Sequence, residues 1–311
     1  MRSSITLAAE ARRRFATEAS IPIDRIKIAL SLSGYGASLP LPHEFDGYYP
    51  PPYGPQAYVY PPDPTNPNRN AFHADESTQS AESEDALTAF HLERLRVYAS
   101  DKEAWRLVDA VTFETVPLAR EVKAIRRAVA VLEDELALGE RKPWWVCIVC
   151  PEGEIPEEHA EVGRGRLGAK DVLAAYFDDV PTVATARAHE GARYAVPDAF
   201  GINCTGMVDV AGAVAAAGDA LSETRAARIG GGQPWLVLKP NGGQTYDMDT
   251  NKWGWRDVAT RLQGDDWAGQ LSDIVHSAGA KGVWGGILVG GCCKAGEEEL
   301  RLLSKALQLQ Q

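Results

Sequence analysis

The sequence is poor in cysteine and contains no long hydrophobic run. Its 311 residues include five cysteines. An odd number of cysteines without regular spacing argues against a disulfide framework and indicates a reducing compartment. No apolar run approaches the roughly 20 residues that a membrane-spanning helix needs. We therefore expect free thiols and no membrane partner.

Positive charge is also in short supply. The chain has 32 Lys and Arg against 43 Asp and Glu, a formal net charge of −11, and shows no basic stripe. This balance argues against a nucleic-acid partner, because surfaces that bind phosphate backbones are strongly basic. Met1–Ser20 is rich in Arg, but Glu10 and Glu18 distinguish it from a transit peptide. We interpret it as an ordinary amphipathic helix, and we expect a cytoplasmic protein.

The rest of the composition is typical of one globular domain. Hydrophobic residues make up 45% and charged residues 24% of the chain. The length suffices for one large α/β domain over residues 1–311. One segment, at about 40–83, differs, because it is dense in Pro, Tyr and Asn, as in Tyr48–Tyr53, and has no periodic pattern. Loops of this length are usually functional or disordered, so we interpret the segment as an insertion.

Apolar runs typical of buried strands alternate with amphipathic stretches typical of helices. The predicted strands are Ile26–Leu32, Val108–Phe113, Trp144–Val149, Ala199–Cys204, Trp235–Leu238 and Gly282–Val289. The predicted helices are Ser4–Ala19, Glu84–Trp105, Leu118–Leu138, Ala169–Phe177, Val208–Ala217, Trp255–Ala278 and a last one after the final strand. The alternation predicts a parallel sheet with helices outside it. Each strand ends in polar or special residues, the pattern of a (β/α)8 TIM barrel with its chemistry at the carboxyl ends.

Two adjacent cysteines, Cys292 and Cys293, follow the last predicted strand. Their Cα atoms lie about 3.8 Å apart across a trans peptide, whereas a relaxed disulfide needs about 4.4–6.8 Å. Two thiolates on one soft metal ion are easier to accommodate. Two buried thiols acting as small hydrophobic groups would explain the pair alone equally well.

A third cysteine, Cys204, ends the predicted strand two positions earlier in the sheet. Alternate strands of a closed barrel can converge at its mouth, so Cys204 can join Cys292 and Cys293. Three thiolates leave one position open on a tetrahedral zinc ion, which is the arrangement of catalytic zinc sites. Cys147 and Cys150 are an odd number of residues apart on one strand and so face opposite sides. We interpret Cys147 as part of the core.

The segments Phe200-Gly-Ile-Asn-Cys-Thr205 and Leu288-Val-Gly-Gly-Cys-Cys293 resemble the two zinc motifs of the homocysteine S-methyltransferase family. Further segments resemble the family in the same order from about Ser3 to the C-terminus: Ser31-Leu-Ser-Gly-Tyr-Gly-Ala37, Phe45-Asp-Gly-Tyr48, Phe90-His-Leu-Glu-Arg-Leu95, Phe113-Glu-Thr-Val-Pro117 and Lys239-Pro-Asn-Gly-Gly-Gln-Thr-Tyr-Asp247. The paired cysteines with the upstream Asn-Cys are the specific part of this resemblance.

The resemblance implies a zinc ion held by Cys204, Cys292 and Cys293, with the sulfur of homocysteine in the open position. Zinc stabilises the thiolate, which is the nucleophile. The implied methyl donor is S-methylmethionine or S-adenosylmethionine, and the product is methionine. Glu114 matches the position that binds the homocysteine amino group, or is a strand-end carboxylate bonded to backbone. Asn203 and Asn241 orient loops or the substrate, or have a purely structural role.

The chain departs from the family pattern at its beginning. The Asp-Gly-Gly strand end and the Thr-rich segment typical of family members are absent, so we expect about six of eight βα units and a barrel incomplete at the N-terminus. A truncated gene model, a partner chain that completes the barrel, or a decayed paralogue would each explain this. The alternative function is therefore a non-catalytic metal-binding or scaffold protein, and oligomers are possible because of open sheet edges. The sequence leaves open the methyl donor and the choice of homocysteine or selenocysteine as acceptor.

Overall fold

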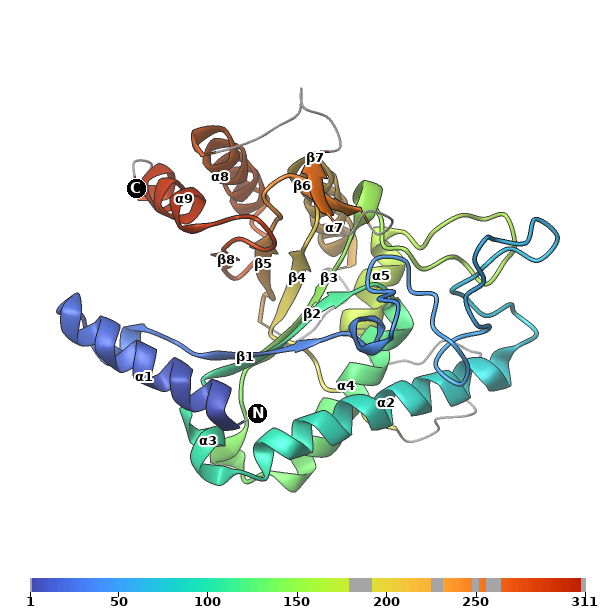
Figure 1. Cartoon of the computed structure of the whole chain (residues 1–311), viewed down its shortest axis with the longest axis horizontal. Coiled ribbons are helices and arrows are strands. Elements are labelled where there is room, and N and C mark those ends of the chain that lie inside the picture. Colours follow the sequence, from blue (N-terminus) through green and yellow to red (C-terminus); the bar gives the residue numbers. More distant parts are fainter. Residues whose placement is uncertain (1, 179–191, 225–231, 248–251, 256–263, 309–311) are drawn as a thin grey trace.

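A six-stranded parallel sheet organises the chain (Figure 1). The structure is a computed structural model that describes residues 2–178, 192–224, 232–247, 252–255 and 264–308. The strands lie in the sheet in chain order: β1 Ala29–Ser33, β2 Ala110–Val116, β3 Trp144–Ile148, β4 Ala199–Asn203, β5 Trp235–Lys239 and β8 Ile287–Val289. Sequential parallel strands joined by helices are the arrangement of a TIM barrel, and within the described ranges β1 and β8 are the edge strands. The predicted strand set and fold class are confirmed.

Helices cover the convex face of this sheet (Figure 1). They are α1 Arg2–Glu18, α2 Ser77–Ala99, α3 Lys102–Leu107, α4 Ala119–Glu135, α5 Ala169–Phe177, α7 Met207–Thr224, α8 Asp265–Ala280 and α9 Glu297–Gln308. From α4 onward each of these helices packs against the next one along the chain. The connections between consecutive strands therefore all run over the same face, as the barrel topology requires.

Alternation along the strands separates two faces of the sheet. Val146 and Ile148 of β3 belong to the main core beneath the helices, whereas Cys147 between them packs on the opposite face with Ala199 and Val237. Successive side chains of a strand point to opposite faces, so this pattern follows directly from the sequence. Burial of each large apolar side chain in the main core contributes about 1.5–3 kcal/mol, which fixes the register of the strands.

Three elements differ from the sequence prediction. Helix α2 begins at Ser77 and not at Glu84, so the end of the insertion is helical. The segment predicted as a loop after β5 is an antiparallel hairpin of β6 Gln244–Asp247 and β7 Lys252–Trp255. Helix α8 begins at Asp265, ten residues after the predicted start, and residues 256–263 lie outside the described ranges.

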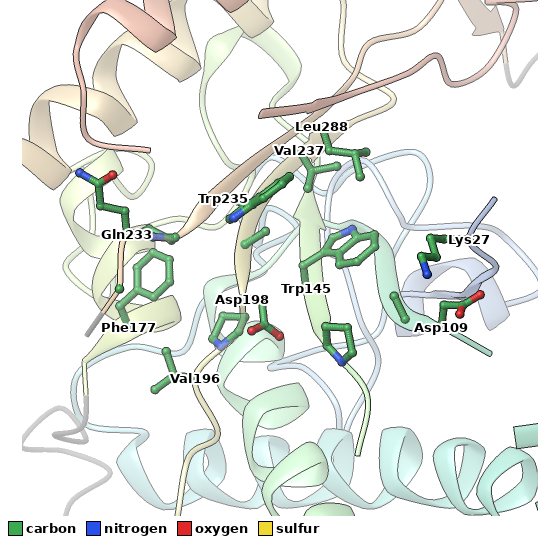
Figure 2. Close-up of a pocket in the computed structure, with 16 residues that line it drawn as sticks. Lys27, Asp109, Trp145, Phe177, Val196, Asp198, Gln233, Trp235, Val237 and Leu288 are labelled. Atoms are coloured by element: carbon green, nitrogen blue, oxygen red, sulfur yellow. The ribbon is translucent and has the colours of Figure 1, made fainter. Parts of the chain in front are cut away.

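A cavity of about 1120 Å³ opens on the concave face, at the amino ends of the strands (Figure 2). Trp145, Trp235, Val237 and Leu288 point into it from β3, β5 and β8. Trp235 is 51% exposed and Leu288 40% exposed. The cysteines singled out above lie at the carboxyl ends of the strands, so this cavity and the candidate metal centre occupy opposite ends of the sheet.

Candidate metal centre

The carboxyl end of β5 lies between the two cysteine-bearing segments and holds both of them. The backbone N–H of Cys204 donates to the carbonyl of Lys239 at 3.2 Å, and that of Cys292 donates to the carbonyl of Pro240 at 2.9 Å. The N–H of Gly242 donates to the carbonyl of Cys293 at 2.8 Å. Main-chain hydrogen bonds therefore fix the chain on both sides before any side chain is considered.

Two backbone features allow this close approach. A Cβ at Gly242 would lie 2.2 Å from the carbonyl oxygen of Lys294, so only glycine fits beside the paired cysteines. Cys204 has a φ of +49°, a left-handed conformation that residues other than glycine rarely adopt. Such strain persists where the surrounding structure fixes it, and it is common at functional sites.

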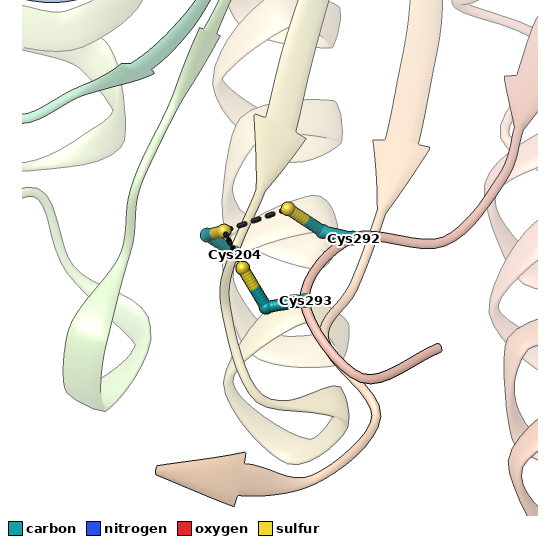
Figure 3. A group of neighbouring side chains, drawn as sticks. All are labelled: Cys204, Cys292 and Cys293. Carbon is teal, nitrogen blue, oxygen red and sulfur yellow. Dashed lines mark hydrogen bonds between the residues drawn. The ribbon is translucent and has the colours of Figure 1, made fainter. Parts of the chain in front are cut away.

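The thiols of Cys204, Cys292 and Cys293 converge on one point (Figure 3). The Sγ atom of Cys204 lies 2.6 Å from that of Cys292 and 3.4 Å from that of Cys293. All three thiols are free and half-buried. The structure thus brings together the three residues that the sequence predicted as metal ligands.

The sulfur spacing suits a tetrahedral metal ion of the size of zinc. Zinc–sulfur bonds of about 2.3 Å in a tetrahedron place two sulfurs about 3.8 Å apart. The Cys204–Cys293 separation of 3.4 Å is close to this value, and the Cys204–Cys292 separation of 2.6 Å would have to open by about 1 Å. Soft thiolate ligands select zinc, copper(I) and iron–sulfur clusters over hard cations. The donor set therefore fits zinc.

The electrostatics of the cluster favour one thiolate over the others. The pKa of Cys292 is lowered to about 6, because the Cys204 thiol donates a hydrogen bond to its sulfur. That same interaction, together with burial, raises the pKa of Cys204. Burial also raises the pKa of Cys293. Three sulfurs that compete for protons in this way would all be stabilised as thiolates by a bound dication.

Glu114, the predicted binder of the amino group, lies on β2 and faces the same side of the sheet as the cysteines. Its Oε1 accepts a hydrogen bond from Thr112 Oγ1 at 2.8 Å and also pairs with Lys239 Nζ of β5. The pKa of Lys239 is raised, since the effects of Cys147, Glu114 and Cys292 outweigh burial, which works to lower it. The carboxylate is therefore held by an ammonium group beside the cluster.

Asn203, the other residue with a predicted substrate role, is 1% exposed and joins β4 to β2. Its Oδ1 accepts from the backbone N–H of Thr115 at 2.9 Å, and its Nδ2 donates to Thr115 Oγ1 at 2.9 Å. Nδ2 also lies 3.8 Å from Cys292 Sγ. Thr115 has a φ of +58° at the point of β2 where its pairing with β3 is irregular, so the amide of Asn203 holds a strained position of β2 next to the cluster.

Sequence reasoning missed two residues of this site. Lys239 begins the family-like segment Lys239–Asp247, but no local pattern of the sequence indicates that its side chain reaches Glu114. Glu44, in the insertion segment, has its pKa raised by burial and also by Cys292, which places its carboxyl group in the surroundings of the cluster. Glu44 directly precedes Phe45-Asp-Gly-Tyr48, and that position was its only signal in the sequence.

The two remaining cysteines stand apart from the cluster. Cys147 is fully buried between Ala199 and Val237, and Cys150 is 2% exposed in the main core. Burial raises the pKa of Cys147 well above that of a free thiol and that of Cys150 to about 12. The prediction that these two face opposite sides, and that Cys147 is part of the core, is confirmed.

Fold and site together define a class: a barrel-type α/β protein with three convergent thiols at the carboxyl ends of its strands. Comparison with known proteins identifies the family. The family model for homocysteine S-methyltransferase matches residues 1–307. The chain belongs to the homocysteine S-methyltransferase family and is by class a methyltransferase.

Two curated maize proteins are similar over almost the whole chain. Homocysteine S-methyltransferase 4 of Zea mays is 26% identical over 99% of this chain and 67% of its own length. Homocysteine S-methyltransferase 1 of Zea mays is 25% identical over 99% of this chain and 71% of its own length. The chain therefore spans about two thirds of the length of these relatives.

A solved structure shares the fold. The metallated form of the homocysteine methyltransferase MmuM from Escherichia coli superposes with a TM-score of 0.53 over 100% of this chain and 69% of that chain, at 19% identity. At this identity the likeness concerns the fold. No helix in the described residues combines the length and the apolar character needed to cross a bilayer.

Proposed function

We propose that this chain transfers a methyl group from a sulfonium donor, S-methylmethionine or S-adenosylmethionine, to the thiol of homocysteine and so forms methionine. The proposal assigns Cys204, Cys292 and Cys293 as ligands of a zinc ion. It treats residues 1–311 as one domain with an insertion at about 40–83. It places the protein in the cytoplasm, where reducing conditions keep its five thiols free.

The observation that carries the proposal is the convergence of the three sulfurs at the carboxyl end of the sheet. Active sites of barrel enzymes lie at this end. Three protein ligands leave one coordination position for a substrate, whereas structural zinc sites use four. Membership of the homocysteine S-methyltransferase family supports homocysteine as the acceptor.

The chemistry requires a thiolate at neutral pH. Bound zinc would supply this by favouring the deprotonated form of a coordinated thiol. In the transfer, a sulfur–carbon bond forms between the homocysteine sulfur and the methyl carbon while the bond from that carbon to the sulfonium sulfur breaks. The donor leaves as a neutral thioether, so the positive charge disappears and no acid is needed for the leaving group.

The protein's own residues orient the acceptor. We assign Glu114 to the substrate ammonium group, because its carboxylate faces the cysteine side of the sheet and is only 15% exposed. Asn203 acts on substrate through Thr115 of β2, whose strained backbone it holds with both amide atoms, and through its contact with Cys292. Both side chains come from strands of the sheet, which position groups more rigidly than loops do.

The test is a metal analysis combined with a transfer assay. Purified chain should carry one zinc, and zinc-edge X-ray absorption should show three sulfur neighbours that become four when homocysteine is added. Homocysteine with a ¹³C-methyl sulfonium donor should then give labelled methionine. A chain that binds zinc through nitrogen or oxygen, or a zinc–sulfur site that never gains a fourth sulfur, would overturn the assignment.

A further inference from the structure

The ion pair of Glu114 and Lys239 crosses the concave face between β2 and β5, two strands that are not neighbours in the sheet. The strands between them carry small side chains at this level. Cys147 of β3 is paired in register with Gly201 of β4. A Cβ at Gly201 would lie 2.4 Å from Cys147 Sγ. The Cys147 thiol takes the place that a side chain at Gly201 would need, so the two intervening strands carry only small groups at this pair of positions.

Contacts within the protein use only part of the hydrogen-bonding capacity of the Glu114–Lys239 pair. Oε1 of Glu114 accepts both from Thr112 and from Lys239. Among the described residues, Oε2 of Glu114 accepts no hydrogen bond and Lys239 Nζ donates to no group except Oε1. A carboxylate oxygen and at least one ammonium N–H therefore remain available on neighbouring charged groups, which are 15% and 20% exposed.

The pair lies beside the cysteine cluster. Lys239 follows Leu238 at the end of β5, pairs in register with Asn203, and its carbonyl accepts from the N–H of Cys204. A substrate whose sulfur binds at the cluster would therefore lie at the same end of the sheet as the Glu114–Lys239 pair. An α-amino acid carries an ammonium and a carboxylate on one carbon, and opposite charges side by side match such a head group.

We infer that Lys239 binds the α-carboxylate of the acceptor while Oε2 of Glu114 binds its α-ammonium, so that the ion pair selects zwitterionic amino-acid thiols. This inference rests on the proposed function, because it assumes a thiol acceptor at the cysteine cluster. Neither partner has to leave the other when substrate binds, since each keeps its bond through Oε1. Lys239 is thus a specificity-determining residue and takes no part in bond making or breaking.

The test uses three thiols and cobalt(II) in place of zinc. They are homocysteine, 3-aminopropane-1-thiol, which lacks the carboxylate, and 4-mercaptobutanoate, which lacks the ammonium. The sulfur-to-cobalt charge-transfer band measures each Kd without any turnover. The unsubstituted chain should bind homocysteine about 10- to 100-fold more tightly than 3-aminopropane-1-thiol, the range of one charge-assisted hydrogen bond.

Lys239→Met removes the charge and keeps the length of the side chain. It should raise the Kd of homocysteine and of 4-mercaptobutanoate about 10- to 100-fold. The Kd of 3-aminopropane-1-thiol should change less than about threefold. Lys239→Arg should retain the preference. Lys294→Met is the matched control, because Lys294 is an exposed lysine next to Cys293 and its loss changes the net charge equally.

An equal rise in the Kd of all three thiols in Lys239→Met would overturn the inference, because it would mean that Lys239 only holds Glu114 in place. An unsubstituted chain that binds 3-aminopropane-1-thiol as tightly as homocysteine would overturn it without any variant. A different result concerns the proposed function: if no thiol produces the charge-transfer band in the unsubstituted chain, the open metal position is wrong, and the inference falls with it.

Discussion

The carboxyl ends of the strands are flanked by two polar clusters that differ in one respect. Three sulfurs meet beyond β4 and β8, where they contact one another and have unequal pKa values. Near β1 and β2, the Glu121 carboxylate of α4 is fully buried and accepts three hydrogen bonds. The sulfurs of the first cluster interact mainly with one another, whereas the carboxylate of the second accepts from donors on other segments of the chain.

The Glu121 carboxylate cluster anchors the segment that follows β1. Oε1 of Glu121 accepts from the backbone N–H of Tyr35 at 2.6 Å and from His91 Nε2 at 2.9 Å, and Oε2 accepts from the Tyr49 hydroxyl at 2.6 Å. Glu121 also lies in the first turn of α4, where the helix dipole stabilises negative charge. A buried carboxylate that accepts hydrogen bonds from several segments holds those segments together, whereas convergent thiols are soft ligands that suit a metal ion.

The largest expected effect comes from removing one sulfur of the cluster. Cys204→Ala, Cys292→Ala and Cys293→Ala should each weaken zinc binding by about 60- to 700-fold. Four-ligand zinc sites bind with about 10–16 kcal/mol, so one ligand accounts for about 2.5–4 kcal/mol. Competition with a chromophoric chelator measures the affinity, and methyl transfer should be lost in parallel.

Cys147→Ala is the matched control for this experiment. It removes a thiol of the same sheet that is fully buried and lies outside the cluster. Zinc affinity and transfer activity should stay within about twofold of the unsubstituted chain, and stability should fall by about 1 kcal/mol, the usual cost of a small core truncation. Stoichiometric, tight zinc in Cys292→Ala would show that the ligand assignment is wrong.

A smaller effect is expected in the carboxylate cluster. Tyr49→Phe removes the donor to Oε2 of Glu121 and leaves a fully buried charge short of one hydrogen bond. The free energy of unfolding should drop by about 1.5–3 kcal/mol, the contribution of a hydrogen bond to a charged group. Urea unfolding with an unchanged m-value would measure it.

The control for Tyr49→Phe is Tyr53→Phe in the same segment. The Tyr53 ring stacks on Tyr35 at 4.0 Å, and its hydroxyl has no hydrogen-bond partner in the part of the chain that the structure describes. This substitution should change stability by less than about 0.5 kcal/mol. Equal effects of the two substitutions would mean that the Glu121 carboxylate does not depend on its donors, and the contrast between the clusters would disappear.

The sequence was sufficient for those features that depend on local patterns. Short apolar runs predicted all six sheet strands, and the adjacency of Cys292 and Cys293 after one strand pointed to the cluster. The sequence did not predict the hairpin of β6 and β7, because each strand has four residues, too few to show a hydrophobic period. The sequence did not predict the first turns of α2, because Ser77–Ser83 contains no large apolar residue that would mark a helical face.

The pairs that complete the site could not be predicted from the sequence. Glu114 and Lys239 are 125 residues apart in the sequence, and they meet across two intervening strands of the sheet. Likewise Glu121 gathers donors from three segments, and no single window of the sequence contains them. Such contacts form between long side chains from strands and helices that are distant in the sequence. Secondary-structure propensity and hydrophobic periodicity are local properties and do not predict them.

The smallest expected effect is the pH dependence that His91 gives to the carboxylate cluster. His91 is fully buried, its Nε2 donates to Glu121, and its Nδ1 has no partner among the described residues. Burial lowers the pKa of His91 below its ordinary value of 6.5 and so favours the neutral ring. Burial works to raise the pKa of Glu121, but its hydrogen bonds lower it below 4.5.

Both groups have a lower pKa in the folded chain than in the unfolded chain, so their contributions to stability have the same sign. Each is fully present above the unfolded pKa and is lost as the pH falls toward the folded pKa. Stability should therefore decline below about pH 6.5 by up to about 1.4 kcal/mol per pH unit from His91 alone. His91→Gln keeps an N–H for Glu121 and removes the titrating ring, so the difference between the two urea-unfolding profiles from pH 7 to pH 5 isolates this residue from the other histidines. Identical slopes for the two proteins would show that His91 binds its proton equally in the folded and unfolded chains, so that burial does not shift its pKa. A steeper loss of stability in His91→Gln than in the unsubstituted chain would show instead that His91 is charged in the folded state and that Glu121 is one half of an ion pair.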